Sequence, residues 1–502
     1  MEADAVNTVA ATINGKVEGR EKEGVVLFAG IPYAAPPVGD LRFKAPRPHE
    51  PWEDVRPAQR FGAAAPQLQG EGLTDRWPVR WDEDCLTLNV STPAVDGGRR
   101  PVLVWIHGGA FRTGQGGIPW YNGARFAVNG DIVVVSFNYR LGALGFAYLA
   151  RFGDEYATSG LTGILDQVAA LEWVRDNIAA FGGDPDNVTI AGESAGAMSV
   201  GTLLGLPRAA GLFRRAILES GAAHHMLPLE AAEKVSDLFR EALDARSIDD
   251  LLAAPAQDVL AAQAKVDAAL GRGAGLVNEL GVAALPFSPV VDGSALPLSP
   301  LEAVRRGASA GVSVIAGTNR DETTLFGYGN IDEERLRKFT VRLGGDEEMV
   351  AAYRAARPDA SSTDVLTAIT TDHMFRVPAI RLAEARAAHG AKTWMYLFAW
   401  ESRAFDGRLK ATHALEIPFA FNNLDKIGVD VFLGEGPTPQ PVADAMHGAW
   451  TSFVRTGDPN CEALPHWPAY DLERRSTMMF NDVSEVGDDP GGAERRLWDG
   501  RR

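Results

Sequence analysis

A serine enclosed by glycines is the part of this chain best suited to chemistry. Ser194 stands in Gly192-Glu193-Ser194-Ala195-Gly196, after an apolar run at 187–191 that predicts a buried strand and before a run at 197–204 that predicts a helix. A serine on a sharp strand-to-helix turn has an exposed hydroxyl, and the next backbone N–H points at the same place. The flanking glycines are needed because a Cβ would collide with the neighbouring strand or helix. This context predicts that Ser194 is a nucleophile.

The same pattern of glycines occurs a second time, around Ser309 in Gly307-Ala308-Ser309-Ala310-Gly311. Here a helical stretch at 301–306 comes first and a predicted strand at 312–316 follows, which is the reverse order. We therefore predict that Ser309 is an ordinary residue of a helix-to-strand loop.

A serine hydroxyl is a weak nucleophile unless a neighbouring base takes its proton and a third group orients that base. Among the nine histidines, His413 lies in a loop after the last strong strand pattern, at 394–398. His389 and His447 fall within helical patterns, where a solvated or packed imidazole is the common role. His413 is therefore the candidate base.

Two neighbouring carboxylates, Asp321 and Glu322, follow the predicted strand at 312–316. Either could orient a histidine while the other pairs with Arg320. The residue types alone do not decide between them.

The loop His107-Gly108-Gly109-Ala110-Phe111 follows a predicted strand at 102–106 and has little side-chain obstruction. Backbone N–H groups in such a loop can be aimed at one point, which is what a developing oxyanion requires. A tight turn alone would also explain the glycines. The combination with the Ser194 turn favours an oxyanion hole.

The predicted helices and strands that must position these residues alternate along the chain. Amphipathic helical spacing over 164–178 and 442–453, the latter with Gly457 as its expected cap, alternates with continuous apolar strands. This alternation predicts an α/β fold with a mostly parallel sheet covered on both faces. An antiparallel edge is expected from 12–17 and 25–28. The predicted buried strands are 102–106, 132–137, 188–191, 216–218, 312–316 and 394–398.

Two helical stretches break the rhythm, at 222–285 and 327–390. We expect them to be insertions above the sheet that build the walls of a pocket. No linker divides the chain, so we expect a single domain over 1–502.

Composition narrows the class of protein. Hydrophobic residues make up 46% of the chain and charged residues 23%, as in a soluble globular protein. The formal charge of −17 argues against nucleic acid or an anionic membrane as partners. We find neither a signal peptide nor a membrane span and expect a cytoplasmic protein.

Together these motifs make the chain resemble the type-B carboxylesterases, the bacterial branch of the carboxylesterase and cholinesterase family of α/β-hydrolases. The likeness covers nearly the whole sequence. The matching segments are 28–34, 36–39, 83–89, 138–142, 165–167, 181–185 and 190–196.

The resemblance implies a role for each candidate residue. The family uses the Glu of an Asp-Glu pair, which is Glu322 here, and its histidine motif is the segment 413–419. The implied triad is Ser194, Glu322 and His413 in the order of this fold. No metal or organic cofactor is implied, and a monomer is expected. The implied oxyanion donors are the N–H groups of Gly109, Ala110 and Ala195.

The expected substrate-binding residues are Phe111, Glu193, Leu285 and Phe326. Small side chains at Ala283 and Leu285 would admit a bulky acyl group.

The chain also departs from the family in two places. Thr323 stands where the family usually has Gly after the acid. Cys85 lacks its usual cysteine partner, so it should be a free thiol, which agrees with a reducing compartment.

The expected activity is hydrolysis of small carboxylic esters through an acyl-enzyme. We expect activity to rise with pH as His413 loses its proton, near a pKa of roughly 6.5 unless burial shifts it. Two alternatives remain. One is a carbamate or amide hydrolase, or a lipase, on the same scaffold. The other is a non-catalytic, cholinesterase-like binding protein, which the presence of all three triad residues disfavours.

Overall fold

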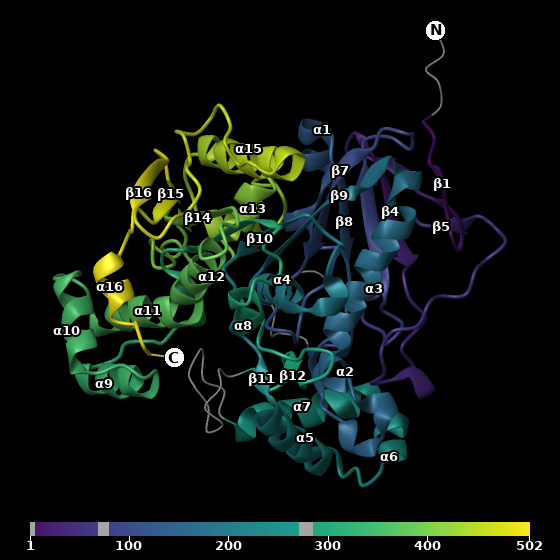
Figure 1. The fold of residues 1–502 in the computed structure, drawn as a ribbon, viewed down its shortest axis with the longest axis horizontal. Helices are drawn as coiled ribbons and strands as arrows, with labels where there is room; N and C mark the ends of the chain where they lie inside the picture. The colour runs from purple at the N-terminus through teal and green to yellow at the C-terminus, as the bar shows by residue number, and fades with distance from the viewer. Residues whose placement is uncertain (1–5, 69–79, 271–284, 502) are drawn as a thin grey trace.

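The computed structural model describes residues 6–68, 80–270 and 285–501. Its centre is a large mixed sheet of eleven strands in the order β16-β15-β14-β13-β10-β9-β7-β8-β6-β4-β3 (Figure 1). The seven strands from β15 to β8 run parallel, and antiparallel strands extend the sheet at both sides. The chain therefore has the α/β architecture that the sequence predicts.

The parallel strands are buried along most of their length because helices cover both faces, which explains their unbroken apolar runs. Their bounds are β7 (Arg100–Ile106), β8 (Val133–Phe137), β9 (Gly183–Glu193), β10 (Arg215–Glu219), β13 (Ser313–Asn319), β14 (Thr393–Phe398) and β15 (Ser476–Phe480). Each of the six predicted strands corresponds to one of them. The flanking strands are β3 (Arg20–Lys22), β4 (Val25–Pro32), β6 (Thr87–Thr92) and β16 (Glu485–Asp488).

Two layers of helices enclose the sheet. Leu171, Leu203 and Leu382 belong to the core on one face, and Phe126, Phe419 and Trp450 belong to the core on the other. The first layer contains α3 (Thr162–Asn177), α4 (Ala195–Gly205), α8 (Pro300–Arg305) and α12 (Val377–Ala387). The second contains α1 (Ala124–Gly130), α13 (Ile417–Ala420) and α15 (Gln440–Thr456).

The predicted insertions form two groups of helices, which Figure 1 places at the lower edge and the lower left. The first group is α5 (Leu229–Leu243), α6 (Ile248–Ala253) and α7 (Ala256–Ala269). The second is α9 (Glu333–Arg342), α10 (Glu347–Ala355) and α11 (Ser362–Thr371), which share a small core of their own. A π-helical turn, η9 (Asp372–Arg376), then leads into α12, which packs on β13 and β14. The end of the stretch 327–390 thus belongs to the layer that covers the sheet.

The remaining elements are short. They are β1 (Val9–Thr12), β2 (Gly15–Glu18), β5 (Arg56–Pro57), β11 (Leu227–Pro228), β12 (Val290–Val291), α2 (Gly142–Phe146), α14 (Val429–Leu433) and α16 (Gly492–Arg496). The 3-10 turns are η1 (Gly39–Leu41), η2 (Pro119–Tyr121), η3 (Ala150–Phe152), η4 (Asp154–Tyr156), η5 (Ser159–Leu161), η6 (Ile178–Phe181), η7 (Pro207–Ala209) and η8 (Glu322–Phe326).

Local predictions can be compared with these bounds. Gly457 caps α15 with φ 83°, as expected. Ser309 lies in the loop between α8 and β13, where its hydroxyl donates to the carbonyl of Leu204 at 2.7 Å. The predicted strand 12–17 is wrong in one respect, because β1 and β2 are two antiparallel strands and Ile13 lies in the turn between them. Within the described residues, every helix is too short or too polar to cross a membrane.

Candidate active site

Ser194 occupies the turn between β9 and α4 with φ 55° and ψ −124°. This left-handed conformation is costly for a residue with a Cβ and persists only where the surroundings enforce it. A Cβ on Gly192 would lie 2.6 Å from the carbonyl carbon of Gly196, and a Cβ on Gly196 would collide with the carbonyl oxygen of Ile106. The close packing of strand and helix therefore explains both glycines of the motif.

His413, in the loop before α13, and Glu322, the first residue of η8, contact each other near this turn. Nδ1 of His413 lies 2.6 Å from Oε2 of Glu322, and the backbone N–H of His413 donates to the carbonyl of Glu322 at 3.2 Å. The N–H of Asn319 donates to Oε1 of Glu322 at 2.8 Å. Because the carboxylate is buried and held on both oxygens, it can fix the imidazole with the proton on Nδ1 and the lone pair on Nε2.

Asp321, the alternative acid, points elsewhere. Its carboxylate pairs with Arg320 at 2.9 Å, and its N–H donates to the carbonyl of Ala411 at 2.9 Å. The geometry thus resolves the choice that the residue types left open, and it is Glu322 that contacts His413.

The other ring nitrogen of His413 faces a second carboxylate. Nε2 lies 3.2 Å from Oε1 of Glu193, and among the hydrogen bonds of the described residues none joins His413 to the Ser194 hydroxyl. A Cβ placed on Gly108 would lie 2.9 Å from Oε2 of Glu193 and 3.1 Å from Cβ of Ser194. The Ser194 side chain, the Glu193 carboxylate and the His413 imidazole therefore lie close together.

The charges of this space govern the titration of the imidazole. Burial by itself lowers the pKa of His413, but the carboxylates of Glu193 and Glu322 outweigh burial and raise it to about 9. Burial also raises the pKa of Glu193, to about 8, although His413 opposes this shift. The site therefore holds a proton between Glu193 and His413 near neutral pH. The value of roughly 6.5 expected for an unperturbed imidazole does not apply here.

Two more buried carboxylates, Glu416 and Glu219, lie near Glu193 and Glu322. They were not assigned to the site from the sequence. Glu416 accepts a hydrogen bond from the Ser220 hydroxyl at 2.9 Å and another from the side chain of Asn319. Burial raises the pKa of Glu416 to about 7, and Glu322 adds to the effect. Glu219 accepts from the Trp450 indole at 2.7 Å. The available signal for Glu416 was its position three residues after His413, directly before α13.

The glycine-rich loop after β7 has an unusual backbone. Gly109 has φ 111°, while Ala110 and Phe111 have φ 55° and 56°. Among the described residues, the N–H groups of Gly109 and Ala110 donate to no other group. Ala195 begins α4, so its N–H has no acceptor within the helix. These three N–H groups are the predicted oxyanion donors, and the approach of Gly108 to Ser194 brings their loops together.

The predicted substrate-binding residues have different surroundings. The ring of Phe326 lies 5.7 Å from that of His413. Phe111 is completely buried, with its ring 5.2 Å from that of Phe146. Phe375, which sequence reasoning missed, is closer to the imidazole, at 4.8 Å between ring centroids.

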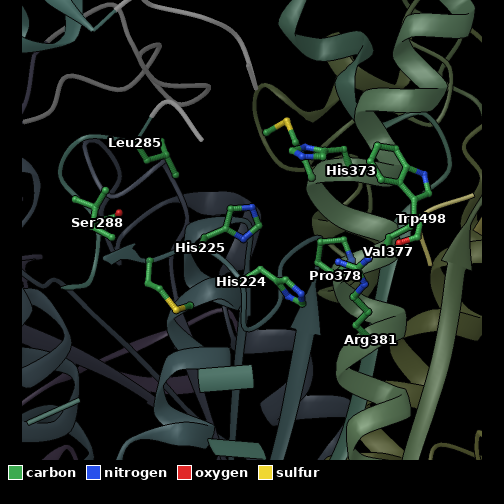
Figure 2. Close-up of a pocket in the computed structure, with 12 residues that line it drawn as sticks. His224, His225, Leu285, Ser288, His373, Val377, Pro378, Arg381 and Trp498 are labelled. Carbon is green, nitrogen blue, oxygen red and sulfur yellow. Dashed lines mark hydrogen bonds between the residues drawn. The ribbon is translucent and has the colours of Figure 1, made fainter. Parts of the chain in front are cut away.

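Leu285 lines a pocket between the segment of His224 and His225 and the helical segment of Val377 and Pro378 (Figure 2). The expected acyl-pocket residue Ala283 lies outside the described residues.

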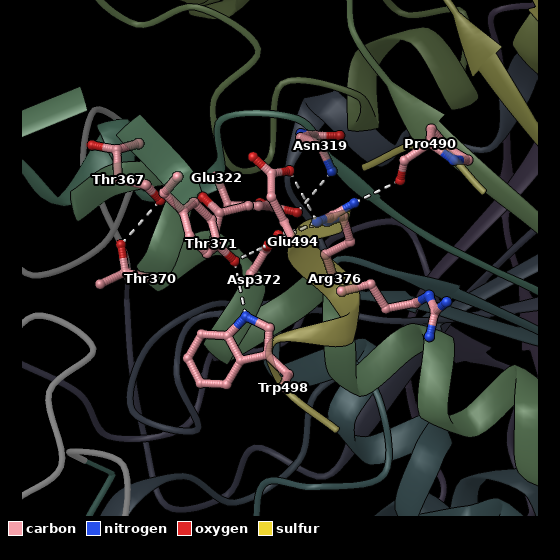
Figure 3. Close-up of polar contacts among 12 residues, drawn as sticks. Asn319, Glu322, Thr367, Thr370, Thr371, Asp372, Arg376, Pro490, Glu494 and Trp498 are labelled. Carbon is pink, nitrogen blue, oxygen red and sulfur yellow. Dashed lines mark hydrogen bonds and ion pairs between the residues drawn. The ribbon is translucent and has the colours of Figure 1, made fainter. Parts of the chain in front are cut away.

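The departure from the family at Thr323 has a structural explanation. Its hydroxyl lies 2.7 Å from that of Thr370 and donates to the carbonyl of Thr367 at 3.1 Å, both on α11. Figure 3 shows Thr367 and Thr370 on the same side as Glu322 and the Asp372–Arg376 ion pair of η9. Thr323 therefore ties the turn that carries the acid to the second group of inserted helices.

No group of three or more His, Cys, Asp or Glu within the described ranges could hold a metal ion. Cys85 is a buried free thiol, as predicted, and Cys461 is also free.

A strand-to-helix serine turn, a histidine bound to a carboxylate and a glycine-rich loop on a mostly parallel sheet define a serine hydrolase of the α/β-hydrolase class. The model of the Carboxylesterase family matches residues 3–498. The para-nitrobenzyl esterase of Bacillus subtilis (strain 168) is 39% identical over 97% of this chain and 98% of its own. The phenmedipham hydrolase of Pseudarthrobacter oxydans is 38% identical, covering 94% of this chain and 95% of its own.

Solved structures agree with this match. The carboxylesterase EST55 of Geobacillus stearothermophilus, at pH 6.2, superimposes with a TM-score of 0.86 and 42% identity, covering 98% of this chain and all of the other. The chain belongs to the carboxylesterase family. It is accordingly a carboxylic-ester hydrolase with the α/β-hydrolase fold.

Proposed function

We propose that the chain hydrolyses carboxylic esters with Ser194 as nucleophile, His413 as general base and Glu322 as the acid that orients it. The observation that carries this assignment is the 2.6 Å contact between Nδ1 of His413 and Oε2 of Glu322, beside a serine held in a strained turn. His413 takes the proton of the Ser194 hydroxyl, whose oxygen attacks the ester carbonyl. The resulting imidazolium is stabilised by Glu322.

The N–H groups of Gly109, Ala110 and Ala195 stabilise the oxyanion of the tetrahedral intermediate. His413 then gives its proton to the leaving alcohol, and the acyl group remains on Ser194. Water repeats the sequence: His413 removes its proton, the hydroxide adds to the acyl carbonyl, and the acid leaves as the serine regains its proton.

The contact between Nε2 of His413 and Glu193 must be broken during the proposed reaction. Catalysis requires Nε2 to accept a proton from Ser194, so the imidazole must turn from the Glu193 carboxylate toward the neighbouring serine. Catalytic hydrogen bonds often become short only when substrate is bound. Substrate binding in the space shared by the three side chains favours this turn.

The substrate class we favour is small, neutral esters. The rings of Phe326 and Phe375 flank the imidazole, so part of the surface beside the reacting groups is apolar. The similarity to a phenmedipham hydrolase over almost the full length of both chains also supports aryl carbamates as a second substrate class. We place the protein in the cytoplasm, because its two cysteines are free thiols.

The test is to compare Ser194→Ala with Ser309→Ala in the hydrolysis of p-nitrophenyl esters of increasing acyl length. Ser194→Ala should lower kcat by roughly four orders of magnitude or more, while Ser309→Ala should change it little. Aryl carbamates are assayed in parallel. Retained activity in Ser194→Ala, with the fold intact by circular dichroism, would overturn the assignment.

A further inference from the structure

The oxyanion loop is strained and must be held in place by its surroundings. Ala110 and Phe111 are consecutive non-glycine residues with φ 55° and 56°. Each left-handed residue of this kind costs roughly 1 kcal/mol or more, so the conformation survives only where neighbouring groups enforce it.

Some of the restraint is local. The carbonyl of Gly109 accepts hydrogen bonds from the N–H groups of Arg112 and Thr113, each at 2.9 Å. The carbonyl of Phe111 accepts from the N–H of Gly142, the first residue of α2, at 2.7 Å. The loop is thus fastened to itself and to α2.

The rest of the restraint comes from α7, far away in the sequence. Nη2 of Arg112 lies 2.9 Å from Oδ2 of Asp267, and the two side chains are only 17% and 2% exposed. One turn earlier on the same helix, Oε1 of Gln263 accepts the N–H of Ala143 at 3.0 Å. A Cβ on Gly142 would collide with that same Oε1. The helix α7 therefore contacts the loop directly, and it also contacts the helix that fastens the loop.

We propose that the Arg112–Asp267 ion pair is a positioning device for the oxyanion hole. Through it, α7 fixes the residue that directly follows the strained pair and so keeps the N–H groups of Gly109 and Ala110 aimed at the reacting carbonyl. The pair is largely buried, so removing one partner takes away a strong electrostatic restraint on the other. The loop then relaxes away from its strained conformation. This inference rests on the proposed function.

The experiment compares Asp267→Asn, Arg112→Met and the double variant with wild type. Active sites are counted by the burst with an organophosphate ester, and kcat per active site, KM and the pH profile are measured with p-nitrophenyl butyrate. Each single variant should lower kcat by roughly tenfold, a fraction of the 10²–10³ lost with a whole oxyanion donor. KM and the pH midpoint should stay the same, because neither ground-state binding nor His413 is touched.

Further variants test the pairing itself. The double variant should lose less activity than the sum of the two single losses, since both single variants remove the same interaction. Arg112→Lys, which keeps the charge, should recover most of the lost kcat. Affinity for a trifluoromethyl ketone, which forms a tetrahedral adduct on the serine, should fall by the same factor as kcat/KM. The control is Asp237→Asn, which breaks the exposed Arg151–Asp237 pair at the same group of helices, and it should have no effect.

Different results contradict the proposed function and the positioning role. A wild-type enzyme that hydrolyses no ester contradicts the proposed function. An active wild type whose Asp267→Asn and Arg112→Met variants keep their kcat per active site contradicts the positioning role, even if fewer molecules are active. Additive losses in the double variant contradict the pairing.

Discussion

Nε2 of His413 lies 3.2 Å from Oε1 of Glu193, the residue that immediately precedes Ser194. The imidazole therefore contacts carboxylates at both of its nitrogens, because Nδ1 contacts Glu322. Two carboxylates favour the imidazolium, whereas catalysis needs the neutral base. This conflict determines how activity should depend on pH.

The first prediction concerns the wild-type pH profile. Burial lowers the pKa of His413, but the neighbouring carboxylates outweigh burial and raise it to about 9, which disfavours the neutral, active imidazole near pH 7. The quantity kcat/KM for p-nitrophenyl acetate should rise with pH and reach its midpoint well above 6.5, the usual range of histidine. A profile that is already flat from pH 7 to 9 would contradict the raised pKa.

The second prediction separates the two carboxylates. Glu193→Gln keeps the shape of the side chain and removes one negative charge, so the pKa of His413 should fall and the midpoint of kcat/KM should move to lower pH. Glu230→Gln is the control, because Glu230 pairs with Lys234 on the exposed face of α5. A midpoint that stays the same, or rises, in Glu193→Gln would show that this carboxylate does not act on the imidazole.

The third prediction tests the acid. Glu322→Gln removes the charge that stabilises the imidazolium and can favour the wrong tautomer, so kcat should fall by roughly three to four orders of magnitude. Asp321→Asn loosens a pair with Arg320 at the surface and should leave kcat within a few fold. The comparison uses single-turnover kinetics with both purified variants. Equal losses, or a larger loss in Asp321→Asn, would reverse the assignment.

Much of this site follows from local sequence. The turns around Ser194 and Gly109 can be predicted from a few neighbouring residues. Each follows the end of a predicted strand, where the chain turns sharply and two backbone segments come close together. Glycine is required at such positions. The order of the neighbouring elements also distinguishes Ser309 from Ser194. The glycines around Ser309 lie in a helix-to-strand loop, between α8 and β13. The choice of Glu322 over Asp321 needed either the family resemblance or the structure, because adjacent residues differ only in the direction of their side chains.

Other relationships join distant parts of the chain and have no local signature. Glu193 is one residue from the nucleophile in sequence, yet its contact with His413 depends on how two loops meet. Asp267 lies on a helix that sequence analysis assigned only to a pocket wall, and nothing in its neighbourhood indicates a partner on the oxyanion loop. The shift of the His413 pKa away from roughly 6.5 has no local signature for the same reason, because a pKa depends on charges brought together by folding.

The final prediction concerns an ion pair between two residues of the family motifs, whose role the motifs alone do not show. Arg140 of the segment 138–142 and Asp166 of the segment 165–167 form a buried ion pair, with Nη2 and Nε of Arg140 at 2.7 and 2.8 Å from the carboxylate oxygens. The backbone N–H of Arg140 donates to the same carboxylate at 3.0 Å. Both side chains are almost fully buried, so we expect these motif residues to support the stability of the fold.

Asp166→Asn should therefore lower the free energy of unfolding by about 3–5 kcal/mol, since it leaves the Arg140 cation buried without its counter-charge. Asp176→Asn is the matched control. It breaks an Arg175–Asp176 pair whose side chains are 54% and 37% exposed, and exposed pairs contribute about 0–1 kcal/mol. Urea unfolding followed by tryptophan fluorescence measures both variants against wild type. If Asp166→Asn lost no more stability than Asp176→Asn, the motif would owe its presence to something other than this buried pair.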